Sequence, residues 1–357
     1  MNGILLENKL YLEDLAYISG LAVPWEKFKD SVIMISGATG MIGSMLIDAL
    51  MYKNEHEELG CNIIALGRNA IKAGERFEKY IGNSHFEFFR CDINKPVIVD
   101  IGVPVDYIIH LASNTHPLAY ASDPVGTITA NVFGTYNLLE YAISHDTKRV
   151  AIVSSNEIYG ENRGDTELFD ECYLGYIDCN TMRAGYPESK RCAESLCQAY
   201  IRQHGLDIVI PRLTRSYGPT LLKTDTKALS QFLSKALDGE DIVLKSAGTQ
   251  YYSYTYVADA VAGLLYVILK GECGEAYNVA DVASDIQLKD LASQIAKAVD
   301  RKVVFDIPDE TEAAGFSKAT KARLDGSKIK SLGWEMKYDI KSGIKRTIEI
   351  MKTIREK

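Results

Sequence analysis

From residue 31 to about residue 210 the chain alternates short, wholly apolar runs with longer stretches of helical periodicity. The helical stretches include Met41–Tyr52, Val125–Ser144 and Glu188–His204. Runs that are apolar on both faces are typical of strands in a parallel sheet whose two faces are covered by the intervening helices. The alternation therefore predicts an α/β fold with a doubly wound parallel sheet. The expected strands are Val32–Ser36, Asn62–Leu66, Phe86–Phe89, Tyr107–Leu111, Val150–Ser154 and Ile208–Pro211.

After residue 211 this pattern loosens into shorter, interrupted elements. We expect an N-terminal extension over residues 1–25 and an NAD(P)-binding Rossmann domain that carries the catalytic residues over 26–211. Residues 212–357 are expected to form mostly a small substrate-binding cap, with some segments returning to the sheet. The expected elements of this last part are helices at Lys227–Leu237, Val257–Leu269, Leu288–Val299 and Ile340–Met351 and a strand at Ile242–Leu244.

Charge and cysteine usage narrow the class of protein. The net charge is −8 with no run of like charges, which argues against binding to nucleic acid or to an anionic membrane. The seven cysteines include no C-x-x-C pair, and no histidines have metal-ligand spacing. No basic segment followed by an apolar core opens the chain, and no apolar run approaches the ~18 residues needed to span a bilayer. We expect a soluble, cytoplasmic protein with reduced thiols and no metal.

A glycine-rich turn joins the first expected strand to the first long helix. Gly37, Gly40 and Gly43 follow the strand directly. Glycines at such a turn permit a tight bend, close approach to a pyrophosphate and close helix–strand packing, while the helix N-terminus offers N–H groups to phosphates. The turn predicts a dinucleotide site. Its expected contacts also include Thr39, Met41 and Ile42.

The end of the second expected strand bears on the choice of cofactor. It reads Ala65-Leu66-Gly67-Arg68, without the acid that usually accepts hydrogen bonds from the adenosine ribose. Arg68 can instead pair with a 2′-phosphate or stack on adenine, and a solvated arginine is the plainer interpretation. We expect NAD(P), with NADP favoured by Arg68 and NAD as the alternative.

Tyr186 and Lys190 lie four residues apart in the helical stretch that ends near residue 204. On a helix this spacing places phenol and ammonium on one face, where the ammonium lowers the pKa of the phenol and makes it a proton acceptor. Ser155 follows the fifth expected strand, and ligands of doubly wound sheets bind at the carboxyl ends of strands. These three residues predict a site that removes a proton from a hydroxyl.

The combination resembles the short-chain dehydrogenase/reductase superfamily. The spacing G-x-x-G-x-x-G is typical of its extended branch, and Ser155, Tyr186 and Lys190 match its Ser–Tyr–Lys arrangement. The segments Ser216-Tyr217-Gly218-Pro219 and Tyr256-Val257-Ala258-Asp259 resemble those of its nucleotide-sugar members, the NAD-dependent epimerase/dehydratase family. The resemblance covers nearly the whole chain from residue 26 onward.

This resemblance implies further ligand contacts. Asp92 would contact the adenine, while His110 and Asn131 would be structural parts of the cofactor site. The other residues implied for the cofactor are Ile93, Leu111, Ala112 and Ser113. Those implied for the nucleotide-sugar substrate are Asn114, Arg212, Arg215, Tyr217, Gln250 and Tyr252. Helices near Val125–Ser144 and Glu188–His204 resemble those that pair two subunits through a four-helix bundle, which implies a homodimer.

The two residues after Ser155 bear on the reaction. Members of the family oxidise a sugar hydroxyl and then epimerise, dehydrate or decarboxylate the keto intermediate. The 4,6-dehydratases carry Thr-Asp-Glu here, but Asn156 is an amide and cannot donate a proton as an acid would. The UDP-glucuronate decarboxylases carry Thr-Ser-Glu, and Glu157 matches the shared glutamate, which simple 4-epimerases generally lack. The resemblance is strongest to UDP-glucuronate decarboxylase, with 4-epimerase and 4,6-dehydratase as alternatives.

Two departures from the family pattern point to a substrate related to UDP-glucuronate but not necessarily identical with it. The family's Q-x-R reads Gln250-Tyr251-Tyr252, so an arginine expected at the diphosphate is missing. Arg215 stands where the family has asparagine, and it either replaces the lost charge or lies on the surface. An NADPH-dependent keto-sugar reductase and a catalytically dead cofactor sensor remain alternatives of another class.

Overall fold

The main sheet of this computed structural model contains eight strands in the described residues, which are 2–115, 117–222, 224–306 and 320–356. Its strand order is β3-β2-β1-β4-β5-β7-β11, with β6 beside β7, and the pairings are parallel. The strands are β1 (Val32–Ser36), β2 (Asn62–Gly67), β3 (Phe86–Arg90), β4 (Tyr107–His110), β5 (Arg149–Ile152), β6 (Ser154–Ser155), β7 (Ile208–Leu213) and β11 (Ala276–Val279). The predicted doubly wound parallel sheet is confirmed.

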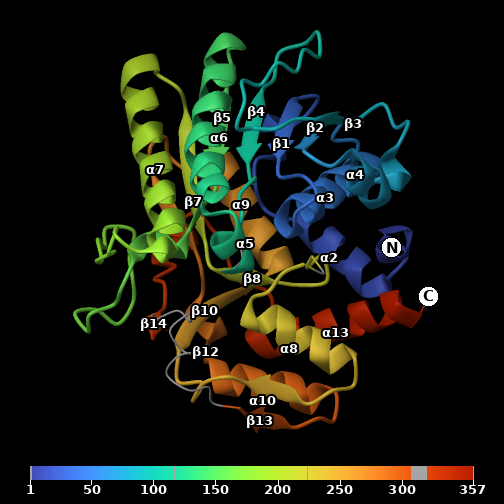
Figure 1. The fold of residues 1–357 in the computed structure, drawn as a ribbon. Helices are drawn as coiled ribbons and strands as arrows, with labels where there is room; N and C mark the ends of the chain where they lie inside the picture. Colours follow the sequence, from blue (N-terminus) through green and yellow to red (C-terminus); the bar gives the residue numbers. More distant parts are fainter. Residues whose placement is uncertain (1, 116, 223, 307–319, 357) are drawn as a thin grey trace.

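Helices cover both faces of this sheet (Figure 1). One face packs on α3 (Met41–Glu57) and α9 (Val257–Lys270), and the other on α6 (Pro124–Ser144) and α7 (Gly185–His204). Alternate side chains of β1 enter the two cores: Ile33 joins the first, and Met34 joins the second. Because the strand is buried on both sides, it has no polar face, which is why its sequence is apolar throughout.

Two strand ends differ from the sequence-based expectation. The expected strand Val150–Ser154 divides into β5 and β6, with Val153 between them donating its N–H to the His110 carbonyl. The expected strand ending at Pro211 continues to Leu213, because β11 pairs with it through Leu213. Both changes arise from pairing with strands that are distant in the sequence.

The segments after residue 213 build a lower layer (Figure 1) and also return to the main sheet. β11 forms an edge of that sheet and α9 is buried against it. Because these later segments belong to the main sheet, the structure does not divide the chain at one point, and the predicted boundary between the Rossmann domain and the cap at residues 211 and 212 stays a prediction. The lower layer contains β8 (Arg215–Tyr217), α8 (Ala228–Leu237), β9 (Ile242–Leu244), β10 (Tyr251–Tyr256), β12 (Asp285–Gln287), α10 (Leu288–Ala298), β13 (Val303–Phe305) and β14 (Lys321–Ala322).

The N-terminal extension is part of the folded body. Its main helix, α2 (Lys9–Ser19), packs beside α3, α9 and α13 (Ile340–Glu356). Tyr11 donates a hydrogen bond to buried Asp48 (2.5 Å), and Tyr17 donates one to buried Asp259 (3.0 Å). Buried Asp14 in turn accepts from the Tyr256 hydroxyl (2.6 Å). The other short helices are α1 (Asn2–Leu5), α4 (Ala70–Arg76), α5 (Pro117–Ser122) and α12 (Ser327–Ser331).

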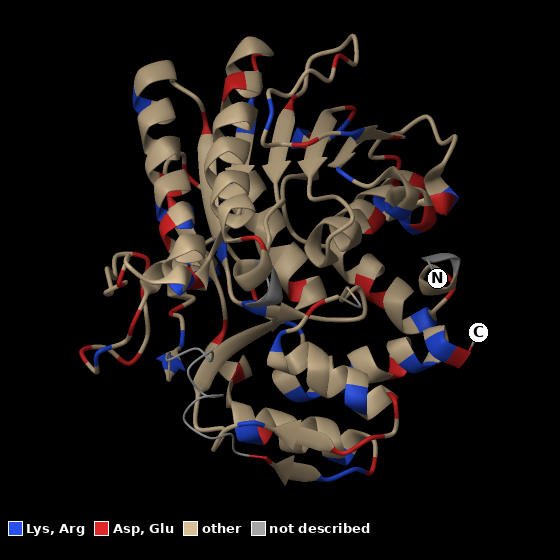
Figure 2. Cartoon of the chain, in the orientation of Figure 1, with Lys and Arg blue, Asp and Glu red and all other residues tan. Residues whose placement is uncertain are grey.

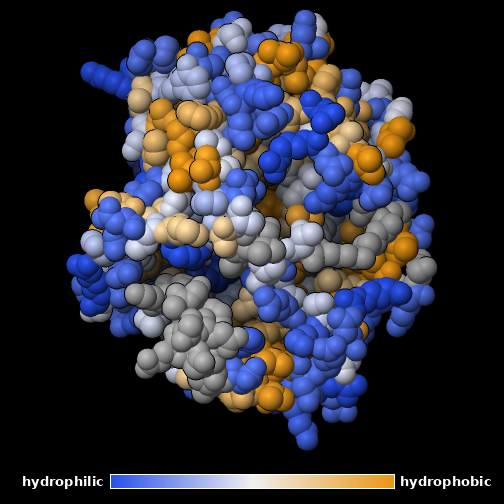
Figure 3. Space-filling view, viewed as in Figure 1, coloured by the Kyte–Doolittle hydropathy of each residue, from blue (hydrophilic) through white to orange (hydrophobic). Residues whose placement is uncertain are grey.

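The surface carries charges of both signs without a single basic face in the view of Figure 2. Apolar atoms gather over the α6–α7 side of the face drawn in Figure 3. Exposed apolar side chains of α6 include Val125, Ile128 and Phe133. Within the described parts of the chain, no helix has both the length and the apolarity to cross a membrane.

Candidate active site

The glycine-rich turn has the shape of a phosphate cradle. Gly37 has φ +70°, and a Cβ there would lie 2.6 Å from the backbone nitrogen of Ala112. A Cβ on Gly43 would lie 2.6 Å from the Gly37 carbonyl oxygen, so a side chain at either position would clash with backbone. No side chain caps the first turn of α3, which leaves its N–H groups open to an anion. Part-exposed Thr39, Met41 and Ile42 and the backbone of Leu111 line the same turn. These residues fit a bound dinucleotide.

The residues expected beyond the cradle occupy different positions. Arg68 is exposed after β2 and forms no ion pair with another described residue, so its guanidinium is available to a ligand. Asp92 accepts a hydrogen bond from the Asn94 N–H (3.2 Å) at the end of β3. The carbonyl of buried Ile93 accepts from Asn137 Nδ2 (2.8 Å). The sequence analysis missed Asn137, which holds this loop in place.

Ser155, Tyr186 and Lys190 meet at the carboxyl ends of the central strands. Ser155 ends β6 and accepts a hydrogen bond from the Glu157 N–H (3.2 Å). Tyr186 lies in the first turn of α7, close enough to Ser155 and Ser113 for both hydroxyls to lower its pKa. Lys190, one turn further along, donates to the Val153 carbonyl (2.8 Å). A hydroxyl placed against Tyr186 and Ser155 would therefore meet a proton acceptor and a hydrogen-bonding partner together.

The sequence predicts that Lys190 lowers the pKa of Tyr186, but the surroundings of Tyr186 in the structure raise it. Burial, followed by the negative charge of Glu157, raises the pKa of Tyr186, and its hydrogen bonds to Ser155 and Ser113 oppose this rise. Burial lowers the pKa of Lys190 to about 8. The protein's own residues thus keep the phenol protonated, and activation requires further positive charge beside it.

A cluster of charge and aromatic rings adjoins Tyr186. The Tyr120 ring stacks on Tyr186 with centroids 5.0 Å apart, and the Arg183 guanidinium lies 5.1 Å from the Tyr120 ring centroid. Arg183 Nη2 lies 3.6 Å from Glu157 Oε2. Asn156, next to Glu157, is buried. The sequence analysis assigned no role to Tyr120 or Arg183, because no motif marks Tyr120 and the position of Arg183 three residues before Tyr186 does not by itself indicate its contacts.

Asn131 and His110 are enclosed rather than open to a ligand. Asn131 accepts from Ser113 Oγ (2.7 Å) and donates to Ser189 Oγ (2.9 Å), which ties α6 to the first turn of α7. Because Asn131 is fully buried, it positions the site and does not contact a cofactor directly. His110 Nδ1 lies 2.7 Å from Ser36 Oγ, and burial lowers the pKa of His110 to about 3. Both residues are enclosed by the protein, which is compatible with the structural role that the resemblance implies.

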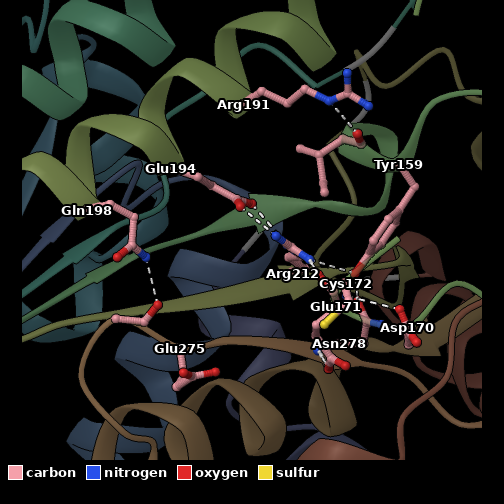
Figure 4. A network of polar contacts seen from close by, with 12 residues as sticks. Tyr159, Asp170, Glu171, Cys172, Arg191, Glu194, Gln198, Arg212, Glu275 and Asn278 are labelled. Atoms are coloured by element: carbon pink, nitrogen blue, oxygen red, sulfur yellow. Dashed lines mark hydrogen bonds and ion pairs between the residues drawn. The ribbon is translucent and has the colours of Figure 1, made fainter. Parts of the chain in front are cut away.

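The structure does not support the expectation that Arg212 binds substrate. Its guanidinium donates to both carboxylate oxygens of Glu194 (3.1 and 2.7 Å), to the Tyr159 hydroxyl (2.9 Å) and to the Glu171 carbonyl (2.8 Å) (Figure 4). Asn278 completes this network by accepting from the Tyr159 hydroxyl (2.6 Å). All three guanidinium nitrogens are engaged inside the protein. Arg212, on β7, therefore ties both α7 and the loop after β6 to the sheet.

Tyr217 likewise differs from its expected role as a substrate contact. Its side chain is fully buried, packs edge-on against Tyr256 at 5.8 Å and lies 3.4 Å from the Ile340 carbonyl. A Cβ on Gly343 would meet its hydroxyl at 2.2 Å, so α13 closes over the ring. Tyr217 thus has no surface for a substrate and belongs to the core.

Arg215 and Tyr252 lie together, as expected for residues of one site. The Arg215 guanidinium lies 3.7 Å from the centroid of the Tyr252 ring. Gln250 contacts Ser246 within its own turn at 3.4 Å, and Asn114 donates to Thr127 Oγ1 (3.3 Å). All four are at least partly buried, and their contact with substrate stays a prediction.

Comparison with known proteins agrees with this arrangement. A family model described as "NAD dependent epimerase/dehydratase family" matches residues 33–280. The chain belongs to this family. UDP-glucuronic acid decarboxylase 6 of Arabidopsis thaliana is 33% identical over 316 residues, which are 87% of this chain and 86% of that protein. The family resemblance inferred from the glycine turn and the Ser–Tyr–Lys residues is thereby confirmed, as is the conclusion that the protein is an enzyme.

Solved structures of nucleotide-sugar enzymes share the fold. A dTDP-glucose 4,6-dehydratase from Streptomyces venezuelae, solved with NAD, matches with TM-score 0.77 and 23% identity over 91% of this chain and 98% of that one. A UDP-glucuronic acid 4-epimerase from Bacillus cereus, solved with UDP-glucuronic acid and NAD, matches with TM-score 0.74 and 22% identity over 90% and 99%. At these identities the matches show the common fold alone.

Proposed function

We propose that this member of the family oxidises C4 of a nucleotide sugar with bound NAD(P) and then decarboxylates the keto intermediate, as a UDP-glucuronate decarboxylase does. The observation that carries the proposal is the meeting of Ser155, Tyr186 and Lys190 beside Glu157, at the strand ends that face the glycine cradle. The 33% identity to a named UDP-glucuronic acid decarboxylase supports the substrate class.

In the first step the Tyr186 oxygen takes the proton of the sugar hydroxyl while Ser155 holds that hydroxyl in place. An oxidised nicotinamide held at the glycine turn would accept the hydride and would supply a positive charge that favours the tyrosinate. Lys190 lies one turn away on the same helix face, but its charge is not among the main influences on the pKa of Tyr186, so the tyrosinate depends mostly on the charge of the cofactor. The pKa of Lys190 near 8 and the raised pKa of Tyr186 make this step dependent on the added charge.

The residues around Glu157 would act in the later step, the decarboxylation of the keto intermediate. A 4-keto uronic acid is a β-keto acid, so the C5–C6 bond breaks with loss of carbon dioxide and its electron pair forms an enolate without a general acid. Glu157, held 3.6 Å from Arg183, would orient the ring for that loss, and protonation of C5 with return of the hydride would complete the cycle. The buried amide of Asn156 provides no acid for a leaving hydroxyl, which argues against 4,6-dehydration.

Three alternatives follow from particular residues. A 4-epimerase would use Tyr186 in the same way without requiring Glu157. The exposed Arg68 favours NADP over NAD and, with it, an NADPH-dependent keto-sugar reductase. A cofactor sensor without activity would not require Ser155, Tyr186 and Lys190 to meet.

We also propose a homodimer through α6 and α7. Val125, Ile128, Phe133 and Tyr136 are exposed on α6, and apolar surface lies over these helices in Figure 3. Light scattering at micromolar concentration is expected to give twice the chain mass of 39.6 kDa. A monomer under these conditions would contradict this pairing.

Mass spectrometry of reaction products tests the proposed reaction. UDP-glucuronate, UDP-glucose and dTDP-glucose are each incubated with the enzyme and either NAD or NADP. We expect only UDP-glucuronate to react, with a product lighter by the mass of carbon dioxide. A product of unchanged mass that separates from the substrate on chromatography would indicate an epimerase, and loss of water would indicate a dehydratase. Net consumption of NADPH would indicate a reductase.

A further inference from the structure

Strand β10 carries two consecutive tyrosines, and each is stacked by an arginine. The Arg323 guanidinium lies 4.6 Å from the centroid of the Tyr251 ring, and the Arg215 guanidinium lies 3.7 Å from that of Tyr252. Successive side chains of a strand point to opposite faces, so the two pairs lie on opposite sides of β10. The molecule thus contains two similar arginine–tyrosine pairs in different surroundings.

The two arginines differ in their charge partners. Arg323 is paired with two acids, with Nε 2.7 Å from Asp285 and Nη1 3.7 Å from Glu167. Arg215 forms no ion pair with any acid in the described parts of the chain, and its Nη1 is buried with no hydrogen-bond partner. A buried donor without a partner destabilises the folded chain, and a charged donor does so more strongly. Such a group is therefore expected to have a partner that the folded chain does not supply.

The location of Arg215 indicates what that partner is. Leu213 pairs with Ser155, and Arg215 lies two residues further along the same chain segment, where β8 pairs with β10. The charges of Arg215, Glu157 and Arg183 all act on the Tyr252 phenol, whose pKa burial raises. Arg215 therefore lies on the segment that follows the partner of Ser155, where a ligand bound at that site can supply the missing partner.

The chemistry of the side chain indicates the kind of ligand. A guanidinium is a planar fork of donors that binds the two oxygens of a carboxylate or phosphate side by side. Stacking on Tyr252 orients this plane and reduces the freedom that Arg215 loses when a ligand binds. Arg183 does not fill the same role, because it is half-exposed and already lies beside Glu157.

We propose that Arg215, oriented by Tyr252, binds an anionic pair of oxygens on the substrate and thereby selects it. This inference rests on the proposed function for the class of substrate, a nucleotide sugar. Two groups of such a substrate present a pair of anionic oxygens to a guanidinium. They are the C6 carboxylate of a uronic acid and the diphosphate. If the partner is the carboxylate, Arg215 is the residue that distinguishes uronic acids from neutral sugars.

Calorimetric binding to the holoenzyme tests the proposal. UDP-glucuronate, UDP-glucose and UDP are titrated into wild type, Arg215→Gln and Arg215→Lys. We expect Arg215→Gln to weaken UDP-glucuronate binding by about 10–100-fold, as for loss of hydrogen bonds to a charged group. Weakening of UDP-glucuronate alone assigns Arg215 to the carboxylate, and equal weakening of all three ligands assigns it to the diphosphate. Arg215→Lys keeps the positive charge but loses the planar pair of donors. Its affinity for the ligand should therefore lie between those of wild type and Arg215→Gln.

Arg323→Gln is the matched control, because it removes the arginine from the other stacked pair. We expect it to lower Tm through loss of its ion pairs while changing the three dissociation constants less than about twofold. Arg215→Gln should leave the Tm of the ligand-free protein unchanged or raise it, since it removes a buried donor without a partner.

Two results would overturn the inference. One is unchanged affinity of Arg215→Gln and Arg215→Lys for all three ligands, and the other is a wild-type protein that binds none of them. Failure of the proposed reaction gives a different result, namely wild type that binds UDP-glucuronate tightly but does not convert it.

Discussion

Arg212 and Arg215 lie three residues apart, and the sequence suggests the same substrate-binding role for both, but their surroundings are opposite. Arg212 has every guanidinium nitrogen engaged by Glu194, Tyr159 or the Glu171 carbonyl (Figure 4). Arg215 has a buried nitrogen without a hydrogen bond. A polar group whose bonds are completed inside the fold stabilises the fold, whereas one left incomplete beside a site is available to a ligand.

The same contrast separates other residues of this protein. Asn131 and Asp259 have their polar atoms paired with neighbours in the interior. Tyr186 and Glu157 belong instead to the proposed active site. Substitutions in the first group are therefore expected to change stability, and those in the second group to change catalysis.

The largest expected effect is on catalysis, at Tyr186. Tyr186→Phe removes the proton acceptor but keeps the ring that stacks on Tyr120. We expect kcat to fall by about 10⁴-fold, at the upper end of the range for general acid–base groups, with Tm and cofactor binding unchanged. Steady-state kinetics and a thermal melt measure the two quantities. A variant that keeps a tenth of the wild-type rate would exclude Tyr186 as the acceptor.

Removal of Arg212 should mainly destabilise the fold. Arg212→Gln removes the partner of the partly buried Glu194 and leaves the Tyr159 hydroxyl without its donor, which is expected to lower the free energy of unfolding by about 2–4 kcal/mol. Urea denaturation measures this change, and Arg215→Gln is the matched control, with little expected loss. If Arg212→Gln were as stable as wild type yet bound substrate poorly, the assignment of Arg212 to the interior would be wrong.

Asp259 should make stability depend on pH in an unusual direction. Burial raises its pKa to about 6, against an unfolded value near 3.9. The folded state thus binds the proton of Asp259 more tightly than the unfolded state does. The contribution of Asp259 to the free energy of unfolding is therefore fully present below pH ~4. It falls by up to about 3 kcal/mol as the pH rises through 6. The free energy of unfolding is measured as a function of pH for wild type and for Asp259→Asn. The difference between the two gives the contribution of Asp259 alone, because other titrating groups such as His110 are present in both proteins. A difference independent of pH from 4 to 7 would contradict this ionisation.

Glu157 should give the smallest of these effects, and one confined to the later step. Glu157→Gln keeps the shape of the side chain but removes the charge beside Arg183. We expect kcat to fall roughly 10–100-fold. Rapid mixing should show reduced nicotinamide forming at least as fast as in wild type, because removal of the Glu157 charge also lowers the pKa of Tyr186, and then persisting, because the intermediate is stranded before hydride return. Normal turnover by this variant would favour a 4-epimerase.

Much of the fold and part of the site could be predicted because local patterns encode them. An apolar run must be buried on both faces, which determined strands such as β1 and β4. The glycine turn is needed because a Cβ at Gly37 or Gly43 would clash with backbone. The four-residue spacing of Tyr186 and Lys190 places them on one face of α7 whatever surrounds the helix.

The tertiary structure decided which polar residues are available to a ligand. The residues near Arg212 in the sequence do not indicate that it pairs with Glu194 and Tyr159. The residues near Tyr217 likewise do not indicate that α13 covers its ring. The stacking of Tyr120 on Tyr186 likewise depends on how separate segments meet. Sequence periodicity thus determined the elements and the catalytic spacing. Whether a given arginine or tyrosine is satisfied within the protein depends on partners distant in the sequence, which only the packed chain brings to it.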